Sequence, residues 1–260
     1  MRVLATIYPF PRKLKKILSY QKINVKECED KYKVYIFHKL KKDINSLTPI
    51  FYLHGGAFAY KGSSCHFKNI MDYALNNDVV IYYLDYDTKL IHPKLEEQVE
   101  KAFLKLKLNP EETILAVDSA GGYLALSLLE KLRKVKALML FYPVVTNSNN
   151  FESKRIFYDT PMWNAKLNEL MWKRFLNSQT IDNFLSVSFD YLPKTYVEIC
   201  EFDCLKDEGV AIANKFNAIY YEIPKAMHGF DIVRNSPITI NALINGNNFI
   251  RKVIETDNRY

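Results

Sequence analysis

Short apolar runs alternate with longer amphipathic stretches along most of the chain. The short runs are rich in β-branched and aromatic residues, as buried strands are, and they lie at residues 34–38, 49–53, 79–84, 113–117, 136–142, 195–202 and 218–223. The longer stretches have the spacing or composition of helices, and they lie at 93–108, 122–132, 208–216 and from 236 toward 254. Ser236 followed by Pro237 is a favourable start for the last helix.

This alternation predicts an α/β fold with a mostly parallel central sheet and helices on both faces. The first two strands, 34–38 and 49–53, follow each other without a long helix, and we expect them to be antiparallel. Residues 146–190 interrupt the pattern with polar turn residues and helical segments that carry both tryptophans. We therefore predict a single domain over residues 1–260, with 146–190 as a small helical cap inserted above the sheet.

The composition is that of an ordinary globular protein, since 48% of the 260 residues are hydrophobic and 25% are charged. It excludes a disordered or fibrous chain. The apolar runs are far shorter than the ~20 residues that cross a bilayer, so no membrane span is expected. The net charge of +7 comes from scattered basic runs without a nucleic-acid-binding motif, so we expect no nucleic-acid partner.

The four cysteines, at positions 28, 65, 200 and 204, have neither zinc-ligand spacing nor a pair placed for a disulfide. The last two fall on one expected strand, which would hold them ~13 Å apart. The first eleven residues contain two prolines and too short an apolar run for a signal peptide. Reduced thiols and a cytoplasmic location are the resulting expectations.

Glycine is scarce, with eight in the chain, and it concentrates at two candidate sites. The first is DSAGG at 118–122, between an expected strand and an expected helix. Ser119 on such a sharp turn is lifted above the sheet edge, and the helix start adds free N–H groups. The second is HGGAF at 54–58, where successive glycines let backbone N–H groups face a site without obstruction. The first site predicts a nucleophilic serine and the second an oxyanion hole.

Two later residues complete a candidate triad. Asp203 closes the strand at 195–202, so we expect its carboxylate at the same sheet edge as Ser119. His228 follows the last strand, whereas the histidines at 38, 66 and 92 lie at no comparable position. Serine, acid and histidine thus follow successive strands in the order that α/β-hydrolases use.

The sequence resembles the hormone-sensitive-lipase-like branch of the α/β-hydrolases, a family of carboxylesterases. The resemblance rests on motifs that span most of the chain in the family's order: HGGAF with Gly62 following, DSAGG, FYPV at 141–144, LPKTYVEICEFDCLKDEG at 192–209 and HGF at 228–230. Two positions depart from the family pattern. Val117 stands where GDSAGG has its first glycine, and Ala57 replaces the third glycine of HGGG.

The resemblance implies an α/β-hydrolase fold and hydrolysis of small carboxylic esters through an acyl-enzyme, without a metal or an organic cofactor. It implies that Ser119 is the nucleophile, His228 the general base and Asp203 the residue that orients the histidine. The implied oxyanion-hole donors are the backbone N–H groups of Gly55, Gly56 and Ala120. The expected partner is a small-molecule ester, and a homodimer is left open.

Aromatic residues of the expected cap are the candidates for substrate contact: Trp163, Trp172, Phe157 and Tyr158. Residues on one helical stripe are expected instead to seal the cap onto the body: Leu167, Leu170, Met171 and Phe175. An aromatic cap over a closed site favours small apolar acyl groups.

Two other functions stay open. A peptidase or amidase on the same scaffold would use the same triad. A non-catalytic ligand-binding protein is supported only by Val117, because a binding protein has no need of serine, acid and histidine together.

Overall fold

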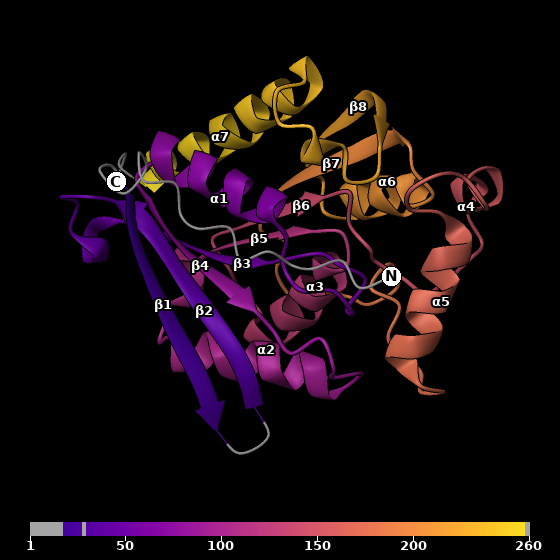
Figure 1. Cartoon of the computed structure of the whole chain (residues 1–260), viewed down its shortest axis with the longest axis horizontal. Helices are drawn as coiled ribbons and strands as arrows, with labels where there is room; N and C mark the ends of the chain where they lie inside the picture. Colours follow the sequence, from indigo (N-terminus) through magenta and orange to yellow (C-terminus); the bar gives the residue numbers. More distant parts are fainter. Residues whose placement is uncertain (1–17, 28–29, 258–260) are drawn as a thin grey trace.

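The computed structural model describes residues 18–27 and 30–257 (Figure 1). The described strands form one eight-stranded sheet in the order β1-β2-β4-β3-β5-β6-β7-β8. They are β1 (Leu18–Glu27), β2 (Asp30–Lys39), β3 (Thr48–Leu53), β4 (Val79–Asp85), β5 (Ile114–Asp118), β6 (Ala137–Phe141), β7 (Lys194–Phe202) and β8 (Ile219–Met227). The pairs β1–β2 and β2–β4 are antiparallel, and the five remaining pairs are parallel. The predicted mostly parallel sheet is confirmed.

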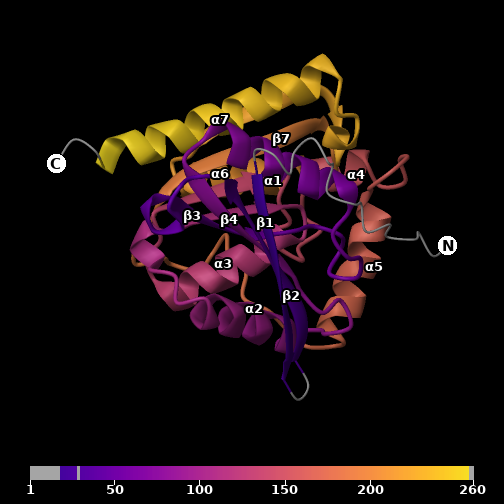
Figure 2. The ribbon, with the colours of Figure 1, turned by 60° about the vertical axis from the view of Figure 1, so that its left-hand side comes forward.

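Helices cover both faces of this sheet (Figures 1 and 2). They are α1 (Ser64–Asn76), α2 (Lys94–Lys105), α3 (Gly121–Leu132), α4 (Glu152–Ile156), α5 (Ala165–Leu176), α6 (Lys206–Lys215) and α7 (Pro237–Asp257). Buried side chains of α1 and α7 share one apolar core with the sheet, and those of α2, α3 and α6 share a second core on the opposite face. Every residue of the central strands β5 and β6 is buried, because both of their faces are covered.

Two elements were not predicted. Strand β1 forms a hairpin with β2 at the edge of the sheet, and its sequence LSYQKINVKE is too polar to read as a buried strand. The second is helix α1, which follows the glycine motif. Its sequence does carry a helical pattern, because Ile70, Met71 and Ala74 are buried on one face. Strands β2 and β3 run in opposite directions as expected, but β4 lies between them, so they are not neighbours.

The connection from β6 to β7 carries α4 and α5, which lie beside the sheet in both ribbon views (Figures 1 and 2). Helix α5 packs against the body through aromatic rings, since Phe175 stacks on Phe58 with centroids 4.0 Å apart. Trp172 meets Tyr123 edge-on at 5.2 Å. This connection contains the segment 146–190 that we expected to form a cap.

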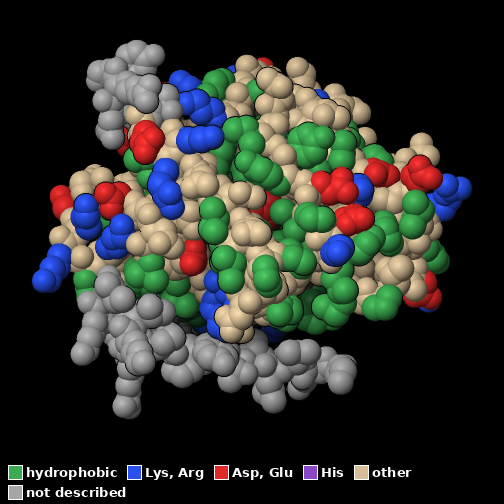
Figure 3. Space-filling model, turned by 90° about the horizontal axis from the view of Figure 1, so that it is seen from above, with side chains coloured by type: hydrophobic (Ala, Val, Ile, Leu, Met, Phe, Trp, Pro, Cys, Tyr) green, Lys and Arg blue, Asp and Glu red, His purple; other side chains and the backbone are tan. Residues whose placement is uncertain are grey.

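One face of the molecule mixes both signs of charge. On the face seen in Figure 3, Lys, Arg, Asp and Glu side chains of the described residues alternate with hydrophobic ones. Among the described helices, none combines the length and the apolar character that crossing a bilayer requires. Cys28 and the first eleven residues lie outside the described part of the chain.

Candidate active site

Ser119 occupies a strained turn between β5 and α3. Its φ of +50° lies in the left-handed region that side chains other than glycine rarely adopt. Backbone bonds hold it there, because its N–H donates to Phe141 O at 2.9 Å and its carbonyl accepts from Val144 N at 2.8 Å. Gly121 has no room for a side chain, since a Cβ would lie 2.4 Å from the carbonyl oxygen of Leu53.

The structure brings together the three residues of the predicted triad. Ser119 Oγ lies 2.8 Å from His228 Nε2, and His228 Nδ1 lies 2.7 Å from Asp203 Oδ2. Asp203 is only 1% exposed, and its other oxygen accepts from the N–H of Leu205 at 3.0 Å. A carboxylate can only accept, so Nδ1 carries the imidazole proton and Nε2 accepts from the Ser119 hydroxyl.

The environment of His228 favours its protonated form. Burial lowers the pKa of the imidazole, but the negative charge of Asp203 and the hydrogen bond to it outweigh burial, so the pKa is raised above 6.5. The ring also meets Tyr142 edge-on, with centroids 4.9 Å apart. His228 is therefore held in place on two sides.

The glycine loop after β3 rests directly on the serine turn. The N–H of Gly55 donates to Asp118 Oδ2 at 2.9 Å, and a Cβ on Gly55 would lie 2.9 Å from the Cβ of Ser119. The Gly55 N–H, which we expected to bind an oxyanion, is therefore engaged by Asp118 in this structure. No hydrogen bond to a described residue is donated by the backbone N–H of Gly56, Ala57 or Ala120.

His54 fixes the start of the same loop. Its ring is fully buried and stacks on Tyr86 with centroids 4.1 Å apart. The Tyr86 hydroxyl donates to the His54 carbonyl at 2.9 Å. Burial lowers the pKa of His54 to about 3, so the ring is neutral and serves packing.

His66 is the residue near the nucleophile that the sequence reasoning missed. Its Nε2 lies 3.1 Å from Asp118 Oδ2, although 52 positions separate the two residues. His66 lies in the first turn of α1, a helix that begins soon after the glycine motif and that we did not predict. The start of this helix is the sequence signal that could have identified His66.

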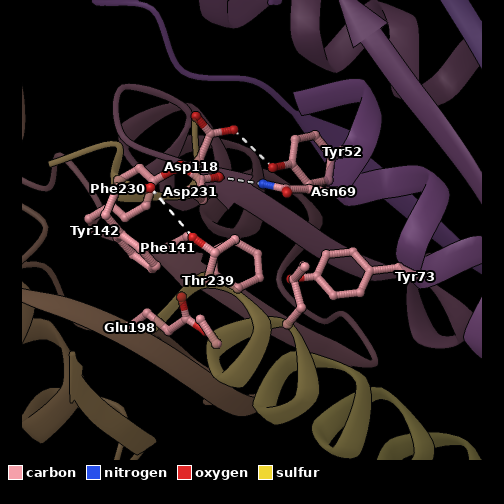
Figure 4. A pocket seen from close by; sticks show the side chains of 12 residues that line it. Tyr52, Asn69, Tyr73, Asp118, Phe141, Tyr142, Glu198, Phe230, Asp231 and Thr239 are labelled. Carbon is pink, nitrogen blue, oxygen red and sulfur yellow. Dashed lines mark hydrogen bonds between the residues drawn. The ribbon is translucent and has the colours of Figure 1, made fainter. Parts of the chain in front are cut away.

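A small pocket lined by polar and apolar side chains includes Asp118, the residue before the nucleophile (Figure 4). Asp231 accepts there from the Tyr142 hydroxyl at 2.9 Å and from the Asn69 amide. Burial raises the pKa of Glu198 to about 8, and its Oε1 accepts from the Tyr196 hydroxyl at 2.5 Å. The cavity measures about 20 Å³, which is room for about one water molecule and too small for a substrate.

The four cap aromatics occupy different environments. Trp163 lies over His228, with ring centroids 5.8 Å apart and planes 30° from parallel. Trp172, which we expected to contact substrate, is 4% exposed and packs in the core with Phe58 and Tyr123. Phe157 lies 6.5 Å from the Phe202 ring, and Tyr158 is 47% exposed.

The two departures from the family pattern leave this geometry intact. Val117 is fully buried in the core on the side of α2 and α3, and the Ser119 hydroxyl still reaches His228. Ala57 adopts a φ of +54°, so the loop keeps a glycine-like backbone at that position. Among the described residues, no group of three or more His, Cys, Asp or Glu is arranged to hold a metal ion.

Comparison with curated proteins finds distant relatives. The alpha/beta hydrolase R526 of Acanthamoeba polyphaga mimivirus is 24% identical over 200 residues, which are 68% of this chain and 58% of that protein. An esterase of Acinetobacter venetianus is 29% identical over 39% of this chain and 35% of its own length. Esterase LipU of Mycobacterium tuberculosis is 36% identical over 33% of this chain and 31% of its own. Each match thus spans less than two thirds of the relative.

Solved structures share the fold along most of the chain. Esterase LipW from Mycobacterium marinum has a TM-score of 0.81 at 19% identity, covering 91% of this chain and 82% of its own. A bacterial heroin esterase has a TM-score of 0.79 at 19% identity, covering 91% and 84%. An esterase of the bacterial hormone-sensitive lipase family has a TM-score of 0.79 at 18% identity, covering 90% and 85%.

The family model described as the alpha/beta hydrolase fold matches residues 50–231. This range contains the glycine loop and all three residues of the predicted triad. The membership of the α/β-hydrolases that the motifs led us to expect is confirmed, and the solved structure from the bacterial hormone-sensitive lipase family shares the fold. The chain belongs to the alpha/beta hydrolase fold family.

Proposed function

We propose that the protein is a serine hydrolase that cleaves small carboxylic esters with Ser119, His228 and Asp203. The observation that carries the proposal is the pair of hydrogen bonds from Ser119 Oγ to His228 Nε2, 2.8 Å, and from His228 Nδ1 to Asp203, 2.7 Å. A serine hydroxyl bonded to the free nitrogen of an oriented imidazole can lose its proton as it attacks. Relatives and neighbours that are named esterases support the same reaction class.

The first half of the proposed reaction forms an acyl-enzyme. Ser119 Oγ bonds to the ester carbonyl carbon while its proton passes to His228 Nε2, and the carbonyl electron pair moves onto oxygen. Asp203 stabilises the resulting imidazolium. The intermediate collapses, the bond to the alcohol oxygen breaks, and His228 returns its proton to the departing alcohol.

The second half restores the enzyme. Water attacks the acyl carbon while His228 accepts one of its protons, and the bond to Ser119 Oγ then breaks. The proton returns to Ser119, and the carboxylic acid leaves. No step requires a group other than these side chains, water and the backbone donors.

We assign the oxyanion hole to the backbone N–H groups of Gly56 and Ala120. Both are free of hydrogen bonds to described residues, and Ala120 directly follows the nucleophile. Each such donor contributes about 3–4 kcal/mol of transition-state stabilisation. Gly55 has a different role, since its lack of a side chain lets the loop lie against Ser119.

We further propose that residues 146–190 act as a cap and that Trp163 lines the acyl pocket. The stacked position of Trp163 over His228 supports this role.

Trp163→Ala is expected to change kcat/KM about tenfold with a small change in thermal midpoint. The matched Trp172→Ala removes a core residue and is expected to cost about 3–5 kcal/mol of stability. If Trp163→Ala leaves kcat/KM unchanged for esters of every acyl length, Trp163 does not line the pocket.

A panel of p-nitrophenyl esters with acyl chains of two to twelve carbons tests the substrate class. We expect the highest kcat/KM for the short chains, because Trp163 restricts the space beside His228. An aminoacyl p-nitroanilide serves as the amide counterpart. Comparable turnover of the anilide would instead identify a peptidase or amidase, and failure to hydrolyse any member would refute esterase activity.

A further inference from the structure

The carboxylate of Asp118 joins three separate segments next to the nucleophile. It accepts from the Tyr52 hydroxyl of β3 at 2.9 Å, from the Gly55 N–H at 2.9 Å and from His66 Nε2 of α1 at 3.1 Å. Asp118 is 3% exposed, and its bond to Tyr52 is visible in Figure 4. Because Asp118 precedes Ser119 directly, it connects the glycine loop to the serine turn.

His66 is fixed in the tautomer that this carboxylate needs. The N–H of Ser63 donates to His66 Nδ1 at 2.8 Å, so the imidazole proton lies on Nε2. Nε2 then donates to Asp118 Oδ2, the same oxygen that accepts from Gly55. His66 thus has two separable contacts, one that begins α1 and one that reaches the serine turn.

The charge of Asp118 determines how firmly it holds Gly55. Burial raises the pKa of this carboxyl, but His66 and the other donors outweigh burial, so the pKa is lowered and the group stays ionised. A hydrogen bond to an ionised acceptor is shorter and about twice as strong as one to a neutral acceptor. Without the His66 donor, burial would raise the pKa of this carboxyl, and a protonated carboxyl would hold the Gly55 N–H less strongly.

We propose that His66 is a positioning residue, which through Asp118 holds the Gly55 amide and so fixes the loop at 54–57 against Ser119. The inference rests on the proposed function, because the loop supplies the oxyanion donor Gly56. His66 does not touch the reacting atoms. Its effect is to keep the N–H of Gly56 aligned before the substrate arrives, which lowers the reorganisation needed in the transition state.

Two substitutions separate the two contacts of His66. His66→Asn keeps an oxygen near the position of Nδ1, which can accept from Ser63, but its amide is too short to reach Asp118. His66→Gln places an amide N–H near the position of Nε2 and can still donate to Asp118. A positioning role therefore predicts that glutamine rescues activity and asparagine does not, whereas a role limited to the start of α1 predicts the reverse.

The kinetic test uses p-nitrophenyl acetate, with kcat expressed per active site counted by a fluorophosphonate. We expect His66→Asn to lower kcat about 10- to 100-fold with KM within about twofold, and His66→Gln to recover most of the loss. His92→Ala is the control, since it removes a similar contact, His92 Nδ1 to Glu96 Oε1 at 2.5 Å, away from the nucleophile. Equal kcat for the Asn, Gln and wild-type proteins would overturn the inference.

Amide hydrogen exchange provides a readout that does not need activity. In a Ser119→Ala background, His66→Asn should speed exchange in the peptide that covers residues 54–60, and His66→Gln should not. If the wild-type protein hydrolyses no ester but this difference appears, the proposed function fails while the positioning of the loop stands. An active wild-type protein with unchanged kcat and exchange in His66→Asn would refute the inference alone.

Discussion

Replacing Ser119 with alanine is expected to lower kcat for p-nitrophenyl acetate by about 10⁴- to 10⁶-fold. The change removes the hydroxyl that donates to His228 Nε2 at 2.8 Å, and with it the covalent route. Alanine adopts the backbone conformation of the turn no worse than serine, so the thermal midpoint should stay within a few degrees of wild type. Steady-state hydrolysis and thermal unfolding of the same samples measure both effects.

Ser127→Ala is the matched control for this variant. Ser127 is also buried and lies on α3, about two helical turns beyond the nucleophile. It should retain nearly full kcat. A Ser119→Ala protein that keeps more than a tenth of wild-type kcat would show that another group performs the chemistry.

The second large effect is expected for Asp203→Asn, which should lower kcat about 10⁴-fold. The asparagine amide can donate to His228 Nδ1, which favours the tautomer that carries its proton on Nε2. A protonated Nε2 cannot accept from the Ser119 hydroxyl. The substitution also removes the charge that stabilises the imidazolium. Asp207→Asn is the control, because the Asp207 carboxylate accepts from the N–H of Ser153 rather than from the histidine. Loss of kcat that is equal in both variants would indicate a general disturbance of the loop after β7.

The pH profile gives the same prediction a second readout. The base must be neutral to accept a proton, so kcat/KM falls as the pH drops through the pKa of His228. Because that pKa is raised, the midpoint of the acid limb should lie above 6.5 in the wild-type enzyme. The residual activity of Asp203→Asn should show this midpoint at a lower pH, since the carboxylate that raises the pKa is gone. An acid limb that does not move would contradict the assigned contact.

The triad could be predicted from the sequence because each member directly follows a strand. Ser119, Asp203 and His228 come after β5, β7 and β8, and parallel strands bring their carboxyl ends to one edge of a sheet. Regular alternation of elements thus placed three distant residues together. The strand order itself could not be predicted, and so β4 was not expected between β2 and β3.

Contacts within the site were harder to predict, because they depend on which donor meets which acceptor. A glycine motif indicates exposed N–H groups, but it does not show that Asp118 engages the N–H of Gly55. In the same way, tryptophan in a cap segment indicates aromatic packing without telling which ring is buried. Trp163 lies over His228 and Trp172 lies in the core, although nine positions separate them.

His66 shows the same limit for helix α1. The sequence reasoning compared histidines by the strand that precedes each, and His66 follows a glycine loop rather than a strand. Its partner Asp118 is assigned only when the loop, α1 and the serine turn are seen together. Residues that act through a second side chain therefore leave little trace in a single sequence.

Labelling with a fluorophosphonate tests the central claim most directly, because the probe reacts only with an activated serine. The intact protein is incubated with the probe at pH 8, and the modified residue is located by peptide mass spectrometry. We predict one adduct per chain, on Ser119, absent from Ser119→Ala and strongly slowed in Asp203→Asn. Failure of the folded wild-type protein to react across the pH range, or an adduct on a different serine, would contradict the account.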